Sequence, residues 1–393
     1  MWPSSCANPI PRAGQARTWP IRGPRPYCVW PDSDTPIPWP PGPGRSPSMN
    51  TLPDSLLAAL RCPLCHSPEL SLATDPSTHW ATCRDCGQDF TVVRSIPYLC
   101  APELAREAGQ DATLDAKPKP VQGQEEPDIE AVTRANRWYH DAMAEHYESD
   151  VSTKDMFDPQ GNCAKRIHEV LSRAASDTEA GLLVDVACGT GNILGKADPL
   201  FDTALGLDIS SSMMTIARER GLTVLGADAF NLPLADQSAD CVTAFSALHH
   251  FQDYLAVTRE MARVLKPGGV FYTDWDPNGH VPHTGWAVRL ALALFKWYQG
   301  RRNPEYVPDK DVQDLAEYHH HHGEGFSGEA LAKVLEEQGF SRTEVHFHFN
   351  PASFDEPQSR SLSGWVLTLL KAVSFIRPTR KNTLPWVAVL AVK

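Results

Sequence analysis

The sequence has no long apolar segment and no excess of basic residues. No apolar run reaches the roughly 18 residues that a membrane-spanning helix needs, and the N-terminus lacks the charged-then-apolar order of a secretory signal. Acidic side chains outnumber basic ones by 48 to 36, which gives a formal net charge of −12. This balance disfavours general attraction to RNA or DNA, although a local basic face stays open. Together these absences predict a cytoplasmic protein.

A disulfide framework is not indicated either. The chain has 10 cysteines among 393 residues, and four of them form two C-x-x-C pairs. In a chain of this length, that pattern is typical of a reducing compartment and of metal binding. The length itself predicts two or three domains.

The first 48 residues have an unusual composition. They hold 13 of the 34 prolines and 4 of the 11 tryptophans, without periodicity. Because proline at this density blocks helices and sheets, we expect residues 1–48 to be a disordered extension. Two origins are open. Met49 could be the natural start, or the segment could be an organellar transit peptide, although its proline content opposes the amphipathic helix of such peptides.

Composition also divides the rest of the chain. Residues 52–100 form a compact unit, and residues 101–128 are polar and contain proline, which is typical of a linker. A helix is predicted over residues 129–149, whose aromatic side chains either cover a ligand or only dock the helix. Residues 129–393 form the main domain.

The stretch 182–192 carries the most information. An apolar run that predicts a buried strand contains Asp185 and is followed by Gly189 and Gly191. Glycines after a strand let the backbone approach a ligand closely. A dinucleotide-binding turn would have a third glycine where this chain has Leu194, and Asp185 would repel a diphosphate. The turn therefore predicts a ligand that is cationic at this end.

Two further predicted strands end in acids. Residues 204–210 contain a strand that ends at Asp208, and residues 222–230 contain one that ends at Asp228. An acid about 20 residues beyond a glycine turn binds ribose hydroxyls in Rossmann-like sheets. Residues 240–251 then predict a fourth strand with its exit loop, and residues 254–273 predict a helix, a Lys-Pro-Gly-Gly turn and a fifth strand.

In this order, residues 180–276 resemble the class I S-adenosylmethionine-dependent methyltransferases. The resemblance implies an α/β fold with a Rossmann-like seven-stranded sheet, which ends in an antiparallel strand pair at residues 343–349 and 386–392. It places substrate-side insertions at about 277–330 and 351–385. It also implies S-adenosyl-L-methionine as the cofactor, with Asp208 on the ribose, Asp228 on the adenine amino group and Ala229 beside the ring. The residues that we assign to the cofactor are Asp185, Ala187, Gly189, Gly191, Asp208, Ile209, Met213, Asp228, Ala229 and Ser246.

Four cysteines predict a structural Zn²⁺ site. Cys62 and Cys65 are separated by 17 residues from Cys83 and Cys86, which fits the C-x₂-C-x₁₅₋₂₀-C-x₂-C spacing. Two such turns provide four thiolates in a tetrahedron around one ion. A unit of about fifty residues has a small core and needs a metal to stabilise it. The unit resembles the zinc ribbons of a 23S rRNA guanine methyltransferase and of the activator of tRNA methyltransferases.

His249 and His250 are the candidate catalytic residues. They follow the fourth strand, where family members often contact substrate, and imidazole titrates near neutral pH, as a general base must. Alternatively, one of them caps the loop or packs on the cofactor. Asp274 and Asp276 are weaker candidates, and the histidine run at 319–322 is a weak candidate for metal binding, because adjacent helical side chains point in different directions.

Two aromatic and basic segments, 284–298 and 361–376, complete the pattern. They either lie on a membrane surface and cover a lipid-like substrate, or are packing helices of the domain. The leading prediction is methyl transfer to a small-molecule or lipid-like acceptor. The alternatives are rRNA or tRNA base methylation, suggested by the zinc unit, and a non-catalytic protein that binds partners on a methyltransferase scaffold.

Overall fold

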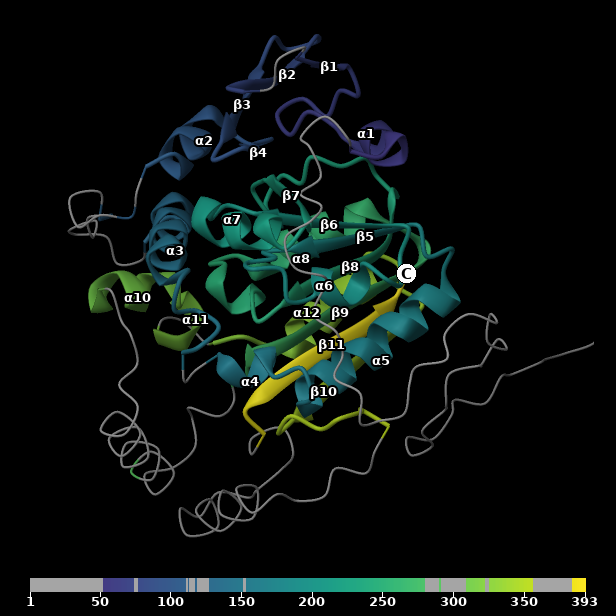
Figure 1. The fold of residues 1–393 in the computed structure, drawn as a ribbon. Helices are drawn as coiled ribbons and strands as arrows, with labels where there is room; N and C mark the ends of the chain where they lie inside the picture. The colour runs from purple at the N-terminus through teal and green to yellow at the C-terminus, as the bar shows by residue number, and fades with distance from the viewer. Residues whose placement is uncertain are drawn as a thin grey trace, which may run out of the picture.

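The computed structural model describes residues 52–73, 77–110, 112, 117–118, 127–150, 153–279, 290, 309–321, 325–355 and 384–393. Within these residues the chain forms a small antiparallel sheet beside a large mixed sheet (Figure 1). The expected extension at residues 1–48 lies outside the described residues.

The small sheet belongs to the cysteine-containing unit. The helix α1 (Asp54–Ala59) precedes four strands, which pair antiparallel in sequence order. These strands are β1 (Leu70–Leu72), β2 (His79–Cys83), β3 (Asp89–Val93) and β4 (Ile96–Pro97). The buried side chains Trp80, Phe90 and Ile96 come from three of the strands. A core of this size is too small to be secure alone, so the unit depends on other contacts.

The large sheet has seven strands in the order β10-β11-β9-β8-β5-β6-β7. Five of them are parallel, and β11 is antiparallel to both of its neighbours. The predicted Rossmann-like α/β fold, with its antiparallel final pair, is confirmed. The strands are β5 (Leu182–Val186), β6 (Thr203–Asp208), β7 (Thr223–Gly226), β8 (Ala239–Phe245), β9 (Leu265–Pro277), β10 (Arg342–His348) and β11 (Trp386–Val392).

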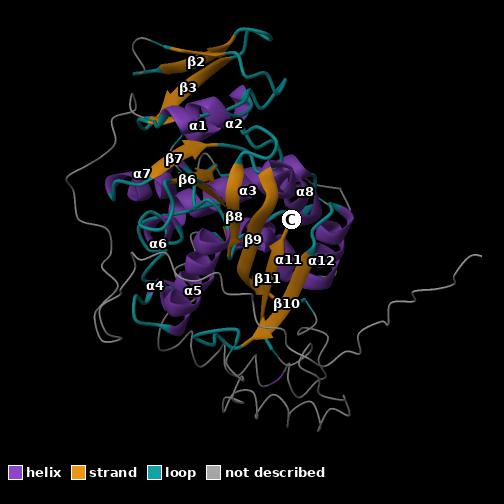
Figure 2. Cartoon of the chain, turned by 90° about the vertical axis from the view of Figure 1, so that its right-hand side faces the viewer, coloured by secondary structure: helices purple, strands orange, loops and turns teal. Residues whose placement is uncertain are grey.

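Helices cover both faces of the large sheet. Alternate side chains of a strand point to opposite faces. Leu183 therefore joins the core formed with α5 (Asn162–Asp177), α6 (Leu194–Ala197) and α7 (Ser211–Glu219), whereas Val184 joins the core formed with α8 (Tyr254–Val264) and α12 (Gly328–Glu337). Figure 2 shows the strands between these two helical layers.

The remaining described helices lie near the predicted site. α3 (Ile129–Met143) ends before the predicted residue 149 and packs against α7 and α10 (Lys310–Ala316). The other elements are α4 (Lys154–Phe157), α11 (Tyr318–His321) and the short 3₁₀ helix η2 (Leu248–His250). None of the described helices is long and apolar enough to cross a membrane.

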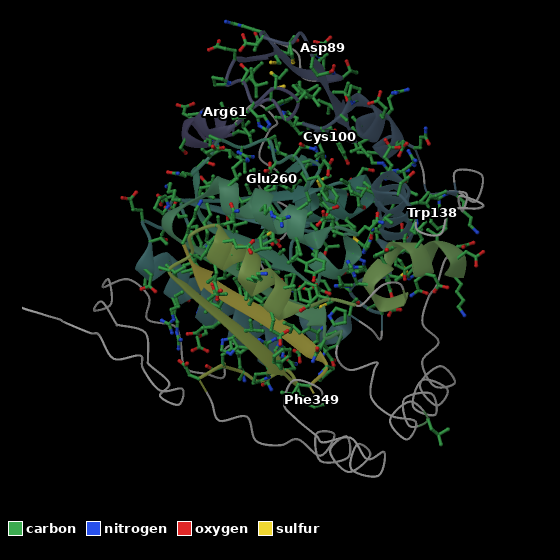
Figure 3. All side chains as sticks on the ribbon, turned by 180° about the vertical axis from the view of Figure 1, so that it is seen from behind. Arg61, Asp89, Cys100, Trp138, Glu260 and Phe349 are labelled. Carbon is green, nitrogen blue, oxygen red and sulfur yellow. The ribbon has the colours of Figure 1, made fainter. Side chains whose placement is uncertain are left out.

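The cysteine-containing unit docks on the β7 edge of the large sheet. The Leu99 N–H donates to the Gly226 carbonyl at 2.8 Å, and Tyr98 forms a parallel bridge with Gly226. A Cβ atom on Gly226 would lie 2.3 Å from the Tyr98 ring, so this contact requires glycine. Figure 3 places Cys100 between the two sheets and Asp89 at the far end of the unit. The unit thereby covers the edge of β7, whose backbone groups would otherwise lack partners on this side.

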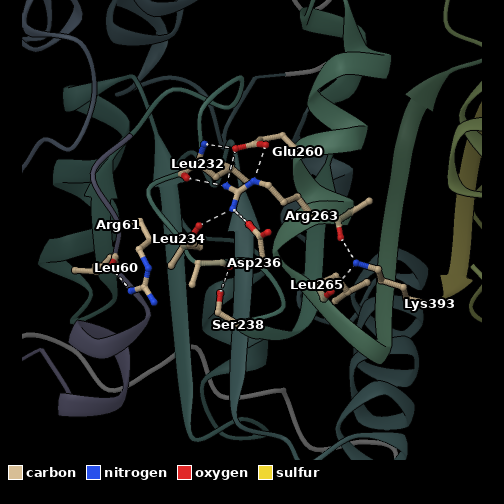
Figure 4. Close-up of polar contacts among 12 residues, drawn as sticks. Leu60, Arg61, Leu232, Leu234, Asp236, Ser238, Glu260, Arg263, Leu265 and Lys393 are labelled. Atoms are coloured by element: carbon tan, nitrogen blue, oxygen red, sulfur yellow. Dashed lines mark hydrogen bonds and ion pairs between the residues drawn. The ribbon is translucent and has the colours of Figure 1, made fainter. Parts of the chain in front are cut away.

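A second contact lies at the loop after β7. The Arg61 N–H donates to the Pro233 carbonyl at 3.0 Å. The same loop is held by Arg263, which lies 2.7 Å from both Asp236 and Glu260 and donates to two loop carbonyls (Figure 4). The hydrogen bond from Arg263 lowers the pKa of Asp236. We call this loop, residues 227–238, the docking loop. The contacts of Arg263 fix its shape.

The structure differs from the expected linker at residues 102–108. These residues form α2 (Pro102–Ala108), in which Ala105 and Ala108 are buried. The Ser211 hydroxyl donates to the Ala108 carbonyl at 2.7 Å. Because the segment is polar on average, its composition did not indicate that two alanine side chains of α2 are buried.

The two aromatic and basic segments cannot be compared with their prediction. Residues 284–298 and 361–376 lie outside the described residues, apart from the exposed Leu290. The expected peripheral membrane contact rests on these segments and therefore stays a prediction.

Candidate active site

The turn after β5 contains three residues with left-handed backbone. Ala187, Gly189 and Gly191 have φ angles of 55°, 53° and 89°. A Cβ atom at Gly189 would meet nothing within 4 Å, whereas one at Gly191 would lie 2.3 Å from the Leu222 side chain. Gly189 therefore leaves room for a ligand, and Gly191 is needed for packing against Leu222.

Asp208, the last residue of β6, faces this turn. One carboxylate oxygen accepts the Gly189 N–H at 2.8 Å, and the other accepts the Ser210 N–H at 2.8 Å. Burial raises the pKa of Asp208, and these backbone bonds oppose that rise. Because a carboxylate can accept about four hydrogen bonds, the group fixes the turn and still has lone pairs for ligand hydroxyls.

The other two predicted acids lie on the neighbouring strands. Asp185 is buried in β5 and accepts the Thr243 hydroxyl at 2.6 Å, while burial raises its pKa to about 7. Asp228 follows β7 and accepts the Phe230 N–H at 3.0 Å, and burial raises its pKa as well. The three acids thus meet at the carboxyl ends of β5, β6 and β7.

These acids line a cavity of about 1130 Å³, a volume that includes its open mouth. The cavity lies where the strand order reverses between β5 and β8, which is the usual ligand position in open α/β sheets. Gly191 does not line it. The other nine predicted cofactor residues do, namely Asp185, Ala187, Gly189, Asp208, Ile209, Met213, Asp228, Ala229 and Ser246.

Local backbone geometry brings two of these residues to the cavity. The Ser210 hydroxyl accepts the Met213 N–H at 3.2 Å, so Ser210 caps the N-terminus of α7 and fixes Met213 in the first turn. Ser246 has a φ of 51°, and its N–H donates to the Asp274 carbonyl at 2.8 Å. This kink turns the chain after β8 toward the cavity mouth.

The two candidate catalytic histidines separate. His250 lines the cavity, and His249 does not. The buried His249 places Nδ1 2.8 Å from an Asp276 carboxylate oxygen, which also accepts the His249 N–H at 3.1 Å. His249 therefore holds the loop after β8, which fits the alternative that one of the two histidines has a structural role.

His250 has the protonation state of a base. Its Nδ1 lies 3.0 Å from the Ala316 carbonyl, which can only accept, so Nδ1 carries the hydrogen. Burial, followed by the neighbouring His249 and His140, holds the pKa of His250 well below its ordinary value. The ring is therefore neutral near pH 7, with an unprotonated Nε2.

One face of α3 forms part of the cavity wall, and it is lined by residues other than the aromatic ones that the sequence pointed to in this helix. Val132, Asn136 and His140 follow each other at intervals of four residues and all line the cavity. Residues spaced in this way share a helix face. In the sequence, the polar residues Asn136 and His140 on an otherwise apolar helix face were the feature that indicates such a role. Trp138, by contrast, packs in a separate buried cluster.

The segment after α3 is tied to the glycine turn. Glu148 accepts the Thr190 hydroxyl at 2.6 Å and forms two hydrogen bonds with Arg220, at 2.6 and 2.9 Å. Arg220 also donates to the Thr190 carbonyl at 3.0 Å. A bidentate pair of this kind fixes geometry as well as distance, so it holds the wall of the cavity in place.

The four predicted metal-binding cysteines converge. The Sγ atoms of Cys62, Cys65, Cys83 and Cys86 all lie within 4.8 Å of one another. The pairs Cys62–Cys86 and Cys65–Cys83 are 3.7 and 3.6 Å apart, too long for disulfides. Zinc–sulfur bonds of about 2.3 Å in a tetrahedron require sulfur separations of about 3.8 Å, so the donor set fits Zn²⁺.

The two halves of the cysteine site have the same backbone turn. The His66 N–H donates to the Cys62 carbonyl at 2.8 Å, and the Gly87 N–H donates to the Cys83 carbonyl at 2.9 Å. His66 and Gly87 both have positive φ, at 59° and 73°. The left-handed position is therefore filled by a histidine in the first turn and by a glycine in the second.

Of the weaker candidates, Asp274, Asp276 and His319 do not line the cavity, and the side chains of residues 320–322 lie outside the described structure. The buried Asp274 forms ion pairs with Arg166 at 2.7 Å and with His348 at 2.8 Å. Its role is therefore structural. His319 places Nε2 2.9 Å from the Phe251 carbonyl. Among the described residues, the cysteine site is the one group of possible metal ligands.

Comparison with known proteins agrees with this geometry. Residues 184–273 match the family model described as a methyltransferase domain. The chain is 42% identical over 91 residues to the "Probable tRNA methyltransferase 9B" of Bos taurus, which covers 22% of this chain and 20% of that protein. It is 39% identical over 95 residues to the demethylmenaquinone methyltransferase of Staphylococcus haemolyticus, which covers 22% of this chain and 40% of that protein.

Among solved structures, phosphoethanolamine N-methyltransferase 2 of Haemonchus contortus is 15% identical with a TM-score of 0.42, and the match covers 68% of this chain and 60% of that chain. The chain spans a fifth to two fifths of the length of the curated relatives that it matches first. By this match, residues 184–273 of this chain form a methyltransferase domain, and they follow an N-terminal four-cysteine unit that resembles a zinc ribbon.

Proposed function

We propose that this protein transfers a methyl group from S-adenosyl-L-methionine to a small-molecule or lipid-like acceptor. The observation that carries the proposal is the single cavity in which nine predicted cofactor residues and the neutral His250 meet. The bound cofactor would supply an electrophilic methyl group. Asp208 would accept the ribose hydroxyls, Asp228 the adenine amino group, and Asp185 would lie near the cationic amino acid end.

The nature of the cavity wall supports a small acceptor. Apolar side chains such as Ile129, Phe157 and Phe251 make up much of the wall, and α3 contributes to it. A pocket with an apolar wall and a few polar groups is typical of small-molecule sites. The formal charge of −12 also supports an acceptor other than RNA.

RNA base methylation is the second candidate. It is supported by the name of the tRNA methyltransferase relatives, although these share only a fifth to a quarter of their length with this chain. A non-catalytic role for the scaffold has less support, since the glycine turn and all three acids are present at the cavity. Crosslinking to RNA in cells would detect the nucleic acid branch, and an absence of crosslinks would favour the small-molecule branch.

We also propose that the cysteine unit binds one structural Zn²⁺. The tetrahedral sulfur spacing supports this metal. The small core of the unit also requires the additional stabilisation that a bound metal would give. The ion would stabilise the unit and would take no part in the reaction, since the cysteines are not among the residues that line the cavity.

The test is calorimetry with S-adenosylhomocysteine. The wild-type protein should bind it, and Asp208→Asn should weaken binding at least about tenfold, because a charged acceptor is lost. Asp236→Asn is the matched control, since Asp236 lies on the docking loop and its side chain is 74% exposed. A wild-type protein that fails to bind S-adenosylhomocysteine would overturn the proposal.

A further inference from the structure

Two amide groups in the cavity wall have an oxygen without a partner. The Oδ1 atom of Asn136 and the Oε1 atom of Gln252 are buried and accept no hydrogen bond in the described structure. Both residues line the cavity. Buried polar atoms are nearly always paired, so two unpaired acceptors in one wall need an explanation.

The orientation of both amides is fixed by their nitrogens. The Asn136 Nδ2 donates to the carbonyls of Val132 and His250 at 3.1 and 2.9 Å, and the Gln252 Nε2 donates to the Pro127 carbonyl at 2.7 Å. Turning either amide over would place its oxygen against these carbonyl oxygens. The unpaired atoms are therefore acceptors and not donors.

Two histidines add acceptors of the same kind. His140 places Nδ1 2.9 Å from the Asn136 carbonyl, as His250 does with the Ala316 carbonyl. Because each Nδ1 must donate, Nε2 is the nitrogen that can accept in the neutral form of either ring. The two rings lie 4.9 Å apart at 90°, and both residues line the cavity.

The four groups are neighbours at one side of the cavity. Asn136 is bonded to the backbone of His250, His140 lies one helical turn from Asn136, and Gln252 follows His250 by two residues. Apolar side chains, among them Ile129 and Phe251, line the cavity with them. A site built to accept hydrogen bonds from a ligand discriminates strongly against an analogue without the donor.

We infer that the methyl acceptor carries a hydroxyl or amine group on an apolar body, and that this group donates its one or two hydrogens within the acceptor wall of Asn136, Gln252, His140 and His250, one of them to His250. The inference rests on the proposed methyl transfer. A new bond forms between the oxygen or nitrogen and the methyl carbon, and the carbon–sulfur bond breaks with its electron pair left on sulfur. The proton released by the hydroxyl or amine passes to the unprotonated Nε2 of His250.

The test uses matched aromatic probes on protein saturated with S-adenosylhomocysteine. The pairs are phenol and toluene, 2-naphthol and 2-methylnaphthalene, and 3-aminobiphenyl and 3-methylbiphenyl, so that each pair differs only in the donor group. Ligand-detected NMR should show that the donor member binds about tenfold more tightly. Equal binding within the pairs, or no binding by the donor members, would overturn the inference.

A substitution assigns the preference to His250. In His250→Asn, the amide nitrogen takes the place of Nδ1 and can still donate to the Ala316 carbonyl, but the Nε2 acceptor is lost. The donor preference should fall severalfold while affinity for S-adenosylhomocysteine is unchanged. His319→Gln is the matched control, because His319 also faces a backbone carbonyl but does not line this cavity. An unchanged preference in His250→Asn would exclude His250 from the acceptor wall.

Calorimetry with S-adenosylhomocysteine distinguishes failure of the proposed methyl transfer from failure of the proposed acceptor. If S-adenosylhomocysteine does not bind, the proposed methyl transfer fails. If it binds and the probe pairs show no donor preference, only the nature of the acceptor is wrong.

Discussion

The hydroxyl of Tyr98 donates a hydrogen bond to the backbone carbonyl of Ile209 at 3.3 Å. Tyr98 follows the last strand of the cysteine unit, and Ile209 lines the cavity. The Tyr98 ring is buried, and it occupies the space beside Gly226 that a side chain would fill. The unit is therefore connected to the cofactor side of the fold through one buried side chain.

Replacing Tyr98 by phenylalanine should weaken cofactor binding. The change removes only the hydroxyl and leaves the Ile209 carbonyl without this donor, at a cost of about 1 kcal/mol in the free energy of unfolding. We expect affinity for S-adenosylhomocysteine to fall roughly 2- to 10-fold, because Ile209 loses a fixed position. Calorimetry and urea unfolding would measure the two effects.

The matched control for Tyr98→Phe is Tyr272→Phe. Tyr272 is also a buried tyrosine, but its hydroxyl donates to Asp274, outside the cavity. It should lose stability without losing cofactor affinity. Equal loss of affinity in both variants would mean that general destabilisation, and not the Ile209 contact, controls binding.

Removal of zinc should destabilise the large domain as well as the cysteine unit. Metal analysis should find about one zinc per chain, and Cys62→Ser should lose it. Because the unit covers the β7 edge and shares buried residues with the main core, a chelator should lower the melting temperature by on the order of 5 °C or more. Added Zn²⁺ should restore it, and added Mg²⁺ should not, since thiolates bind Mg²⁺ poorly. An unchanged melting temperature would show that the unit is an independent appendage.

Asp185→Asn should stabilise the cofactor-free protein at pH 7.5. The folded-state pKa of about 7 lies above the ordinary value of 3.8, so the folded state holds the proton more tightly than the unfolded state. The resulting stability is present below about pH 4 and is lost as the pH rises toward 7. A neutral asparagine avoids this loss, on the order of 2–4 kcal/mol. Urea unfolding at pH 4.5 and 7.5 would measure it, and equal pH dependence in both proteins would contradict it.

Asp274→Asn should destabilise the fold strongly. Arg166 and His348 hold the pKa of Asp274 well below its ordinary value against the effect of burial, so the stability from this carboxylate is lost only as the pH falls. Asparagine would leave the buried Arg166 charge without a counter-ion, at a cost of about 3–5 kcal/mol. Asp355→Asn, which breaks an exposed pair with Arg173, should cost at most about 1 kcal/mol. Similar losses in both variants, measured by urea unfolding, would contradict the buried-pair argument.

Much of the site could be predicted because its residues follow strand ends. Each parallel strand ends at the same edge of the sheet, so acids that are 20 residues apart in the sequence meet in space. Asp185, Asp208 and Asp228 were found in this way. The cysteine site was equally accessible, since C-x-x-C pairs fix the geometry of each half locally.

Other parts depended on long-range contacts. His249 and His250 are adjacent in the sequence, but the Asp276 carboxylate, 27 residues away, holds one of them and leaves the other on the cavity wall. The unpaired oxygen of Asn136 has no signature in the helical pattern of α3. The alanine face of α2 was hidden in a polar segment, because two small side chains contribute little to a composition average.

The sequence by itself determined the sheet, the glycine turn, the three acids and the cysteine pairs, because short-range periodicity and spacing specify them. Only the tertiary structure decided that the cysteine unit docks on β7, that His250 and not His249 lines the cavity, and that unpaired acceptors gather beside it. These features depend on which side chains meet across elements far apart in the chain. Such meetings are governed by packing and hydrogen-bond partners, which no local pattern encodes.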